Sequence, residues 1–481
     1  MLFNSLEYML FLPLVAALYF LLKPRFRWIM LLIASYWFYM SWKAEYAILI
    51  LFCTAINYLS TLLLARMKSR KLRGLLLAAD LILSFGVLFV YKYLGFATQN
   101  LNLLIEKTNL AFRIPQFDLL LPVGISFFTF QTLSYTIDVY NGRIKPEKNF
   151  GMLALFVSFF PQLVAGPIER SESLLPQFRV VHRFNIARAT NGLRIILWGL
   201  FKKIVVADRL SLIVDKVYND ITHFGAWAYI IATLAFAVQI YCDFSGYSDI
   251  AVGTAKILGY DLMQNFKRPY FSKSTGEFWR RWHISLSTWF RDYVYIPLGG
   301  NRVGKARYYF NNLITFVLSG LWHGANWTFV LWGLLNGIYV ALGRATRGVR
   351  EKFVSFTGLE KAPKLHRFTR VLITFSLVCL SWVLFRANSL GDAVYILKHM
   401  IPAGISADMF SGLGSRLDLA AAALGVFVLL FAEYSGRGET RLKRLFDRSI
   451  AIRFLSYLFL IVLILTFGVT GHELAFIYFQ F

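Results

Sequence analysis

The sequence LITFVLSGLWHGANWTFVLWGLLNG (313–337) places one histidine, His323, in an otherwise apolar and aromatic run. An ionisable side chain at membrane depth is costly, so a histidine there is by default a hypothesis for a functional site. Gly324 follows it and is small enough for a substrate or another backbone to approach closely. A side chain that can carry a proton, next to such a residue, predicts a reaction centre inside a membrane protein.

The composition of the whole chain indicates that the bilayer is its solvent. The 481 residues are 57% hydrophobic and only 16% charged, and the mean hydropathy is +0.56. Because a bilayer core needs a run of roughly 20 apolar residues, we expect an all-α polytopic membrane protein of about ten to thirteen spans. The expected spans are 6–22, 27–42, 45–65, 74–95, 118–140, 191–214, 226–242, 311–320 continuing through 327–342, 368–385, 415–433 and 451–470.

The first apolar run has no basic segment before it and is followed by Lys23, Arg25 and Arg27 rather than by a small-residue cleavage site. We therefore expect it to remain as the first span instead of being removed as a signal peptide. The cysteines lie far apart in apolar segments without metal-ligand spacing, so we expect them to be packing residues and expect no metal site. They are Cys53, Cys242 and Cys379.

The net charge of +25, from 51 basic and 26 acidic residues, would suggest a nucleic-acid partner in a soluble protein. Here the basic residues cluster in short loops between the expected spans, so we expect them to mark cytoplasmic loops by the positive-inside rule, and we expect no nucleic acid. Counting spans between these clusters predicts that the N-terminus and the stretch 96–116 lie outside. The clusters lie at 23–27, 66–73, 143–148 and 344–352.

Two apolar segments, 151–168 and 284–298, break the expected alternation of sides. Basic residues flank both ends of each segment, and the first contains Pro161, Gly166 and Pro167. Such segments are tolerated only where protein buries them or they line a cavity, so we expect both to be re-entrant or in-plane elements. They would thin the membrane locally, and a catalytic group at mid-depth could then be reached from both faces.

A second run of polar groups lies in the middle third of the chain. Asp243 and Asp249 flank Gly246 within a largely apolar segment, and two interpretations stay open: they pair with buried arginines, or they line a water-filled cavity. Among the seven histidines, only His283 and His323 lie in aromatic surroundings next to polar clusters.

Five ordered motifs resemble the membrane-bound O-acyltransferase superfamily and, within it, the bacterial alginate O-acetyltransferase-like branch. They are LPVGISFFTFQTLSYTIDVYNG (121–142), FFPQLVAGPIER (159–170), YCDFSGYSDIAVG (241–253), NFKRPYFSKSTGEFWRRWHISLSTWFRDYVYIPLGGNR (265–302) and LWHGANWTFVLWGLLNG (321–337). The resemblance implies one integral membrane acyltransferase domain over 1–481, in the bacterial cytoplasmic (inner) membrane. This domain would have a motif-dense core at about 120–340, and C-terminal helices with an aromatic tail at 368–481. The implied fold is a ring of transmembrane helices, with re-entrant or in-plane elements around a thinned centre.

The resemblance also implies two catalytic residues. His323 in WHGAN matches the invariant histidine of the superfamily, and His283 in WRRWHIS matches a second histidine typical of the branch. Acyl transfer from a thioester to a hydroxyl needs a base that takes the hydroxyl proton, and a neutral imidazole suits that task. Asn326, the Trp322 indole N–H and His283 are candidate donors to the oxyanion.

The acyl donor implied by the resemblance is acetyl-CoA, used as a substrate, with no bound cofactor. Its phosphates favour a basic cytoplasmic mouth, although topology signalling is an alternative role for the same basic residues. The implied acceptor is an extracytoplasmic polysaccharide such as alginate, another exopolysaccharide or peptidoglycan, reached directly or through a separate periplasmic esterase-like acetyltransferase partner. The candidate donor contacts are Lys267, Arg268, Arg280 and Arg281.

Two other functions stay open at this point. One is D-alanyl transfer to teichoic acid, in which the donor is a carrier-protein thioester. The other is non-enzymatic export of an activated precursor. The paired histidine motifs, and the lack of inverted repeats visible in the sequence, argue against export.

The chain ends in GHELAFIYFQF (471–481). This tail is too short to cross a membrane and too apolar to extend into water, so we expect it to dock on the protein or the lipid. One interpretation is an interfacial aromatic anchor. The other is an acyl relay at Tyr478, whose phenol would accept the acetyl group and pass it on; the tail resembles the F-x-Y-x-x-F ending of a small companion peptide of the D-alanyl-transfer branch.

Overall fold

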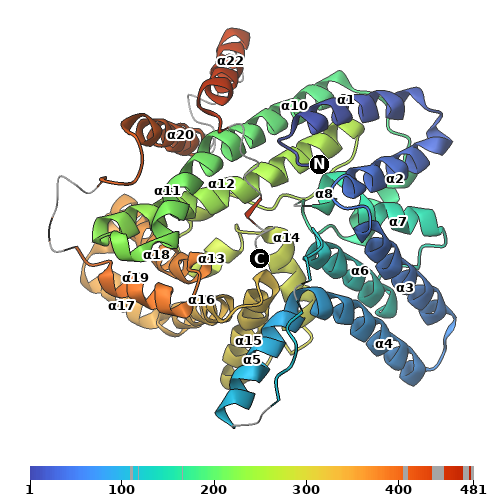
Figure 1. The fold of residues 1–481 in the computed structure, drawn as a ribbon, viewed down its shortest axis with the longest axis horizontal. Helices are drawn as coiled ribbons and strands as arrows, with labels where there is room; N and C mark the ends of the chain where they lie inside the picture. Colours follow the sequence, from blue (N-terminus) through green and yellow to red (C-terminus); the bar gives the residue numbers. More distant parts are fainter. Residues whose placement is uncertain are drawn as a thin grey trace. The chain divides into compact units, whose positions relative to one another are not determined.

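The computed structural model describes residues 1–108, 112–117, 119–164, 166–402, 404, 410–435, 449–469 and 476–477. This part of the chain consists of helices joined by loops and has no strand (Figure 1). The all-α fold expected from the sequence is therefore confirmed.

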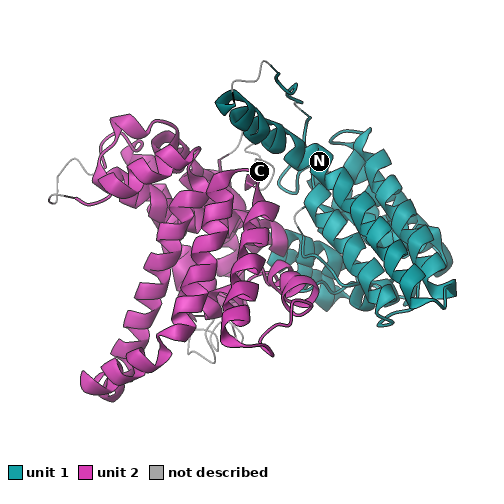
Figure 2. Ribbon diagram, turned by 90° about the horizontal axis from the view of Figure 1, so that it is seen from below, with its two compact units in different colours: residues 1–196, 250–263 teal, residues 197–249, 264–481 magenta. Residues whose placement is uncertain are grey.

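The chain divides into two compact units, which Figure 2 colours separately. Unit 1 comprises residues 1–196 and 250–263, and unit 2 comprises residues 197–249 and 264–481. Two long helices, α10 (Ile186–Leu200) and α12 (Ala226–Leu258), continue from one unit into the other. The expectation that 1–481 acts as a single acyltransferase domain stays a prediction.

Unit 1 holds the N-terminal helices. They are α1 (Leu6–Leu21), α2 (Pro24–Met40), α3 (Tyr46–Arg66), α4 (Arg70–Leu88), α5 (Leu94–Lys107), α6 (Ile125–Tyr140), α7 (Phe150–Ser158), α8 (Phe160–Leu163) and α9 (Ser171–Leu174). Unit 2 holds α11 (Asp208–Asn219), α13 (Thr275–Trp279), α14 (Ile284–Phe290), α15 (Lys305–His323), α16 (Trp327–Ala345), α17 (Arg347–Phe356), α18 (Pro363–Arg386), α19 (Leu390–His399), α20 (Arg416–Ser435) and α22 (Ile450–Phe467).

Several of these helices begin where a side-chain oxygen accepts a backbone N–H of the first turn. Such a cap satisfies one of the donors that a helix leaves unpaired at its N-terminus. The capping residues are Ser5, Ser69, Asn149, Ser274, Asn326, Ser389 and Ser449.

Seven helical segments of the described chain are long and apolar enough to cross a membrane, fewer than the number expected. Two runs expected as spans, α1 and α6, form helices of only 16 residues. The seven segments are Tyr46–Arg66, Arg70–Lys107, Ala226–Leu258, Trp327–Ala345, Pro363–Arg386, Arg416–Ser435 and Ile450–Phe467.

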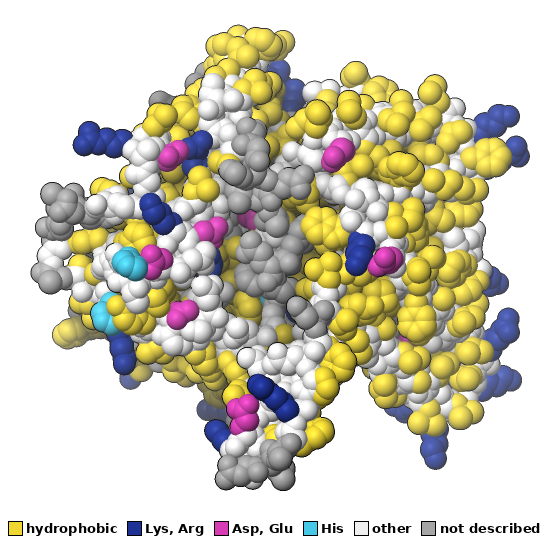
Figure 3. All heavy atoms as spheres, in the orientation of Figure 1, with side chains coloured by type: hydrophobic (Ala, Val, Ile, Leu, Met, Phe, Trp, Pro, Cys, Tyr) yellow, Lys and Arg dark blue, Asp and Glu magenta, His cyan; other side chains and the backbone are white. Residues whose placement is uncertain are grey.

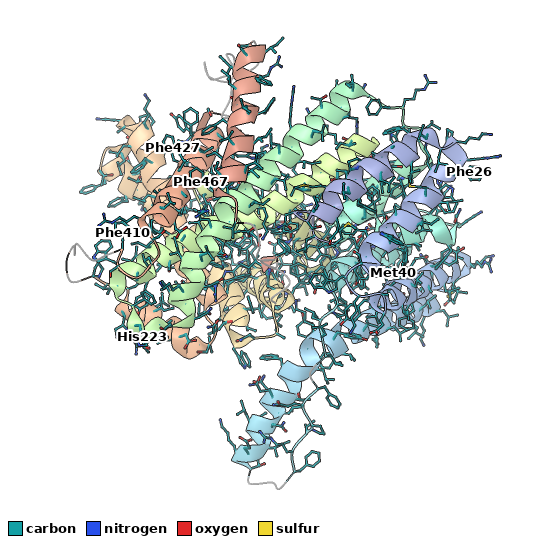
Figure 4. All side chains as sticks on the ribbon, turned by 45° about the horizontal axis from the view of Figure 1, so that its top comes forward. Phe26, Met40, His223, Phe410, Phe427 and Phe467 are labelled. Carbon is teal, nitrogen blue, oxygen red and sulfur yellow. The ribbon has the colours of Figure 1, made fainter. Side chains whose placement is uncertain are left out.

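The exposed surface agrees with a lipid environment. Hydrophobic side chains cover much of the face that α1 to α4 present in Figure 3, and Lys and Arg project at its margin. Phe26 on α2 and Phe427 on α20 are 42% and 64% exposed and project outward in Figure 4. Apolar surface on this scale is unusual in a soluble monomer. The protein is therefore a multi-pass membrane protein.

Two expected boundaries are wrong. The sequence predicted a span at 226–242, but α12 runs unbroken over 33 residues. The polar residues after 242 do not end the helix, because Asp243 and Asp249 are paired with lysines inside unit 2. The stretch 96–116, expected as an outer loop, is helical up to Lys107, because α4 continues through a π-helical turn into α5.

The two segments expected to be re-entrant are short helices. Segment 151–168 contains α7 and α8, which are separated at Phe159 and have almost entirely buried side chains. Segment 284–298 contains α14 and a π-helical turn that ends at Tyr295. None of these helices is long enough to cross a bilayer. Their path relative to the membrane stays a prediction.

Helices α15 and α16 form a tight antiparallel hairpin in unit 2. The sequence predicted that 311–320 continues through 327–342, whereas the structure breaks the run after His323. Gly324 is extended there, and the Asn326 side chain caps α16 by accepting the Thr328 N–H at 3.0 Å. Past the turn the two backbones come close at Gly320 and Gly333, where a Cβ would collide with backbone atoms of the other helix. The hairpin thus fixes His323 at its turn.

Adding a methyl group at the close approach should destabilise the hairpin. A Cβ at Gly333 would overlap the Phe316 carbonyl oxygen, whereas a Cβ at Gly343, on the same helix, would lie 3.7 Å from Thr275 Oγ1. We expect Gly333→Ala to lower the stability of the detergent-purified protein by about 1–3 kcal/mol. The matched variant Gly343→Ala should be neutral or slightly stabilising, because alanine favours a helix. Equal melting temperatures of the two variants would contradict the close packing.

Candidate active site

The two histidines singled out in the sequence lie together in unit 2. Their ring centroids are 6.4 Å apart, and His283 and His323 are only 1% and 2% exposed. Every other histidine in the described part of the chain is more exposed than these two. The others are His182, His223, His366 and His399, while His472 lies outside the described residues.

Aromatic rings from three helices surround His323. The Trp322 and Trp332 rings each lie 5.0 Å from its ring, and the Phe385 ring lies at 5.4 Å. Trp322 belongs to α15, Trp332 to α16 and Phe385 to α18. An imidazole at this place is shielded from bulk water, so electrostatic interactions with a bound substrate would be strong.

His283 stands at the start of α14 in a left-handed backbone conformation, with φ of 42°. This is uncommon for a residue with a side chain, and such positions cluster at functional sites. Its ring packs edge-on against Phe244 at 4.5 Å and faces Trp322 at 5.9 Å. Burial lowers the pKa of His283 from its ordinary value of 6.5 to about 3, so its neutral form is favoured.

Asn265 holds the backbone around His283. Its carbonyl oxygen accepts the Ile284 N–H at 2.9 Å, and its side-chain Oδ1 accepts the Ser285 hydroxyl at 2.6 Å. Lys267 N–H donates to the Arg281 carbonyl at 2.9 Å. The stretch 265–267 therefore runs beside 281–285 and fixes the conformation that turns His283 inward.

The four basic residues considered as donor contacts lie on this same part of unit 2. Lys267 and Arg280 are exposed, and Arg268 and Arg281 are half-buried. The Arg281 guanidinium pairs with Glu277 at 2.7 Å. The structure thus brings these cations near the chain segment that carries His283, but contact with an acyl donor stays a prediction.

Asp243 and Asp249 pair with lysines rather than with arginines. Lys203 Nζ lies 2.7 Å from Asp243 Oδ1 and 2.7 Å from Asp208 Oδ1. Lys202 Nζ lies 2.6 Å from Asp249 Oδ2. Of the two interpretations left open by the sequence, ion pairing is therefore the one observed, with lysine as the partner. The role in a water-filled cavity stays untested.

Both lysines lie in a π-helical turn, Phe201–Ala207, between α10 and α11. π-Helical turns are frequent at functional sites. The sequence analysis missed Lys202 and Lys203, although two adjacent lysines within an expected span were a signal, since charges inside a span are rare and are usually paired. The structure also adds Asn265 and Phe244, which lie within two of the quoted motifs but were not among the candidate site residues.

Part of the C-terminal tail docks against α12. The Ile477 N–H donates to Asp243 Oδ2 at 2.8 Å, and the buried Phe476 ring lies 4.5 Å from Tyr247 and 5.8 Å from Phe244. The expectation that the tail docks is confirmed for these two residues. Tyr478, the candidate acyl relay, lies outside the described residues.

The other candidates have defined surroundings. Asn326 uses its side-chain oxygen to cap α16, and the Trp322 ring packs against both histidine rings, with its centroid 5.9 Å from that of His283 and 5.0 Å from that of His323. Their role as oxyanion donors stays a prediction.

Within the described residues, no three His, Cys, Asp or Glu side chains come together as metal ligands. The arrangement offers two imidazoles and indole N–H groups in a dry site, which suits proton transfer to or from a bound hydroxyl.

The chain is similar to known membrane acyltransferases. A sequence model described as the membrane-bound O-acyltransferase family matches residues 149–385, which includes both histidines. A probable alginate O-acetylase of Azotobacter vinelandii is 40% identical over 413 residues, covering 84% of this chain and 79% of the relative. A peptidoglycan O-acetyltransferase of Helicobacter pylori is 36% identical over 436 residues, covering 83% and 80%.

A more distant relative is a teichoic acid D-alanyltransferase of Streptococcus thermophilus, which is 29% identical over 283 residues, covering 55% of this chain and 68% of the relative. The alignments with the two acetyltransferases extend over most of both chains. Together with the all-helical multi-pass fold and the buried histidine pair, they show that this chain is an O-acyltransferase and belongs to the membrane-bound O-acyltransferase family.

Proposed function

We propose that this protein passes acetyl groups from cytoplasmic acetyl-CoA across the inner membrane for O-acetylation of an extracytoplasmic polysaccharide, such as alginate, another exopolysaccharide or peptidoglycan. Relatives named for alginate and for peptidoglycan acetylation support the acetyl group and this class of acceptor. A periplasmic esterase-like acetyltransferase would complete the transfer in cases where the polysaccharide does not reach the site itself.

The observation that carries the proposal is the pair of buried histidines inside an aromatic enclosure. We assign His323 as the base that removes the proton from the attacking hydroxyl. The hydroxyl oxygen then bonds to the acyl carbon, the carbon–sulfur bond of the thioester breaks, and the imidazolium returns its proton to the leaving thiolate. His283, neutral in its buried place, is assigned as a donor to the oxyanion, together with Trp322 or Asn326.

D-Alanyl transfer to teichoic acid is the second candidate. Its support is the Streptococcus thermophilus relative, whose alignment covers a shorter part of this chain at lower identity than the acetyltransferase alignments. The two candidates differ in the acyl donor, because acetyl-CoA is a small soluble thioester whereas the D-alanyl donor is a carrier protein. Export without acyl transfer has no such support, since the family is one of acyltransferases.

Replacing the base should abolish acetylation. We expect His323→Ala to lower the rate of polysaccharide acetylation by on the order of 10²–10⁴, because a general base contributes about that much. The measurement is the acetyl content of cell-surface polysaccharide in cells fed labelled acetate. His223→Ala, the same deletion at an exposed histidine, is the matched control and should keep normal acetylation. Full acetylation in the His323→Ala cells would rule out the assigned base.

The buried, neutral state of His283 should make folding sensitive to acid. Between the ordinary pKa of 6.5 and the folded pKa of about 3, the unfolded chain binds a proton at this residue and the folded chain does not. The free energy of unfolding therefore falls as the pH drops through that window. We expect His283→Asn to weaken this decline, and asparagine also tolerates a positive φ. Identical pH dependence of the melting temperatures would contradict a neutral buried His283.

The two roles considered for the tail predict different results when the Tyr478 hydroxyl group is removed. If Tyr478 relays the acyl group, Tyr478→Phe should remove polysaccharide acetylation while leaving membrane insertion and expression unchanged. If the tail is only an aromatic anchor, the same variant should retain near-normal acetylation, since the ring remains. Mass spectrometry of the C-terminal peptide for an acetylated species gives an independent reading.

A further inference from the structure

The C-terminal tail is attached to unit 2 on both sides of its undescribed segment 470–475. Where the chain leaves α22, the Arg209 guanidinium donates to the Phe467 carbonyl at 2.6 Å, and the Val469 N–H donates to the Ile204 carbonyl at 3.3 Å. Ile204 lies next to Lys203 in the same π-helical turn. Farther along the chain, the Ile477 N–H reaches Asp243. The turn and the facing part of α12 thus hold the tail at two places.

The charges at this place explain why a backbone N–H is held there. One cation, Lys203, faces two carboxylates, Asp208 and Asp243, and all three side chains are at least 94% buried. A buried carboxylate needs hydrogen-bond donors, because desolvation of an unpaired charge is costly. The Ile477 N–H supplies one at Asp243 Oδ2, and a hydrogen bond to a charged acceptor is stronger than a neutral one.

The docked residues also contact the wall of the histidine site. Phe476 is fully buried, and its ring lies 5.8 Å from the Phe244 ring. The Phe244 ring also packs against the His283 ring, and the two ring centroids are 4.5 Å apart. Asp243 and Phe244 are adjacent residues on α12. Asp243 accepts the hydrogen bond from the tail, and Phe244 packs against His283.

We propose that Asp243, held by Lys203, is a positioning residue that seats the C-terminal tail beside His283. The expected effect on acyl transfer rests on the proposed function, whereas the docking of the tail on Asp243 is independent of that function. Neither Asp243 nor Lys203 needs to touch the acyl group. Their part is to keep residues 476–477 on α12, and with them the start of the segment that continues into Tyr478.

The test exploits an isosteric change. In Asp243→Asn, the amide oxygen should turn to the Lys203 ammonium, since an NH₂ group cannot accept from it. The Ile477 N–H would then face another donor. Lys203 keeps Asp208 as its counter-ion, so the fold should survive. We expect deuterium exchange at the Ile477 amide, measured on the full chain in lipid nanodiscs, to rise about ten- to hundredfold, as expected when a hydrogen bond to a charged acceptor is lost.

Asp249→Asn is the matched control for exchange. It makes the same change on the same helix at the carboxylate that pairs with Lys202, and it should leave exchange at Ile477 unchanged. A second variant, Ile477→Pro, removes the N–H without altering the buried charges, and exchange at the neighbouring tail amides should rise about tenfold. Unchanged tail exchange in both Asp243→Asn and Ile477→Pro would overturn the proposal.

A measurement of acyl transfer shows whether the contact with Asp243 positions the tail for the reaction or only attaches it to the protein. With the tail released, Asp243→Asn should lose most polysaccharide acetylation while its melting temperature stays close to that of Asp249→Asn. Faster tail exchange together with normal acetylation would overturn the positioning role. A failure of the proposed function itself would be recognised separately, as missing acetylation in the unmodified protein, and the exchange result would still be valid.

Discussion

A charge buried in the interior of a membrane protein must be paired, and this constraint organises the centre of unit 2. Lys202 and Lys203 enter the interior from one π-helical turn, and carboxylates on α12 meet both of them. The pairing brings the turn against α12, where a Cβ on Gly246 would lie 3.2 Å from the Lys203 backbone nitrogen. α12 can therefore remain a single helix through its polar stretch and can carry Phe244 to the histidine site.

The histidine site is built on the opposite principle, which is the exclusion of water by apolar rings. The α15–α16 hairpin fixes His323 at its turn, and Asn265 fixes the strained backbone of His283. Rings from α12, α15, α16 and α18 close around the two imidazoles. Such an enclosure keeps bulk water away from the two imidazoles, which is what the proposed transfer from a thioester to a hydroxyl needs, since water would otherwise compete for the acyl group.

The sequence predicted the all-helical membrane fold, and it singled out the two histidines that the structure brings together. His283 and His323 could be found because buried histidines among aromatic residues are rare, and because their motifs resemble a known family. The partners of Asp243 and Asp249 were not identified, because Lys202 and Lys203 are distant in the chain from both carboxylates and because arginines were the expected partners. The length of α12 was missed for the same reason: polar residues looked like a helix end until their partners were known. The contact of Phe476 and Ile477 with α12 depends on tertiary structure, which no local pattern reports.

We propose that the buried His323 is the base for acyl transfer from a soluble thioester. The most direct measurement compares donor binding with single-turnover transfer, using purified protein in lipid nanodiscs, labelled acetyl-CoA and an oligosaccharide acceptor. The His323→Ala protein should bind acetyl-CoA as tightly as the unmodified protein but should transfer no measurable label to the acceptor. Transfer by His323→Ala at the unmodified rate would contradict this proposal.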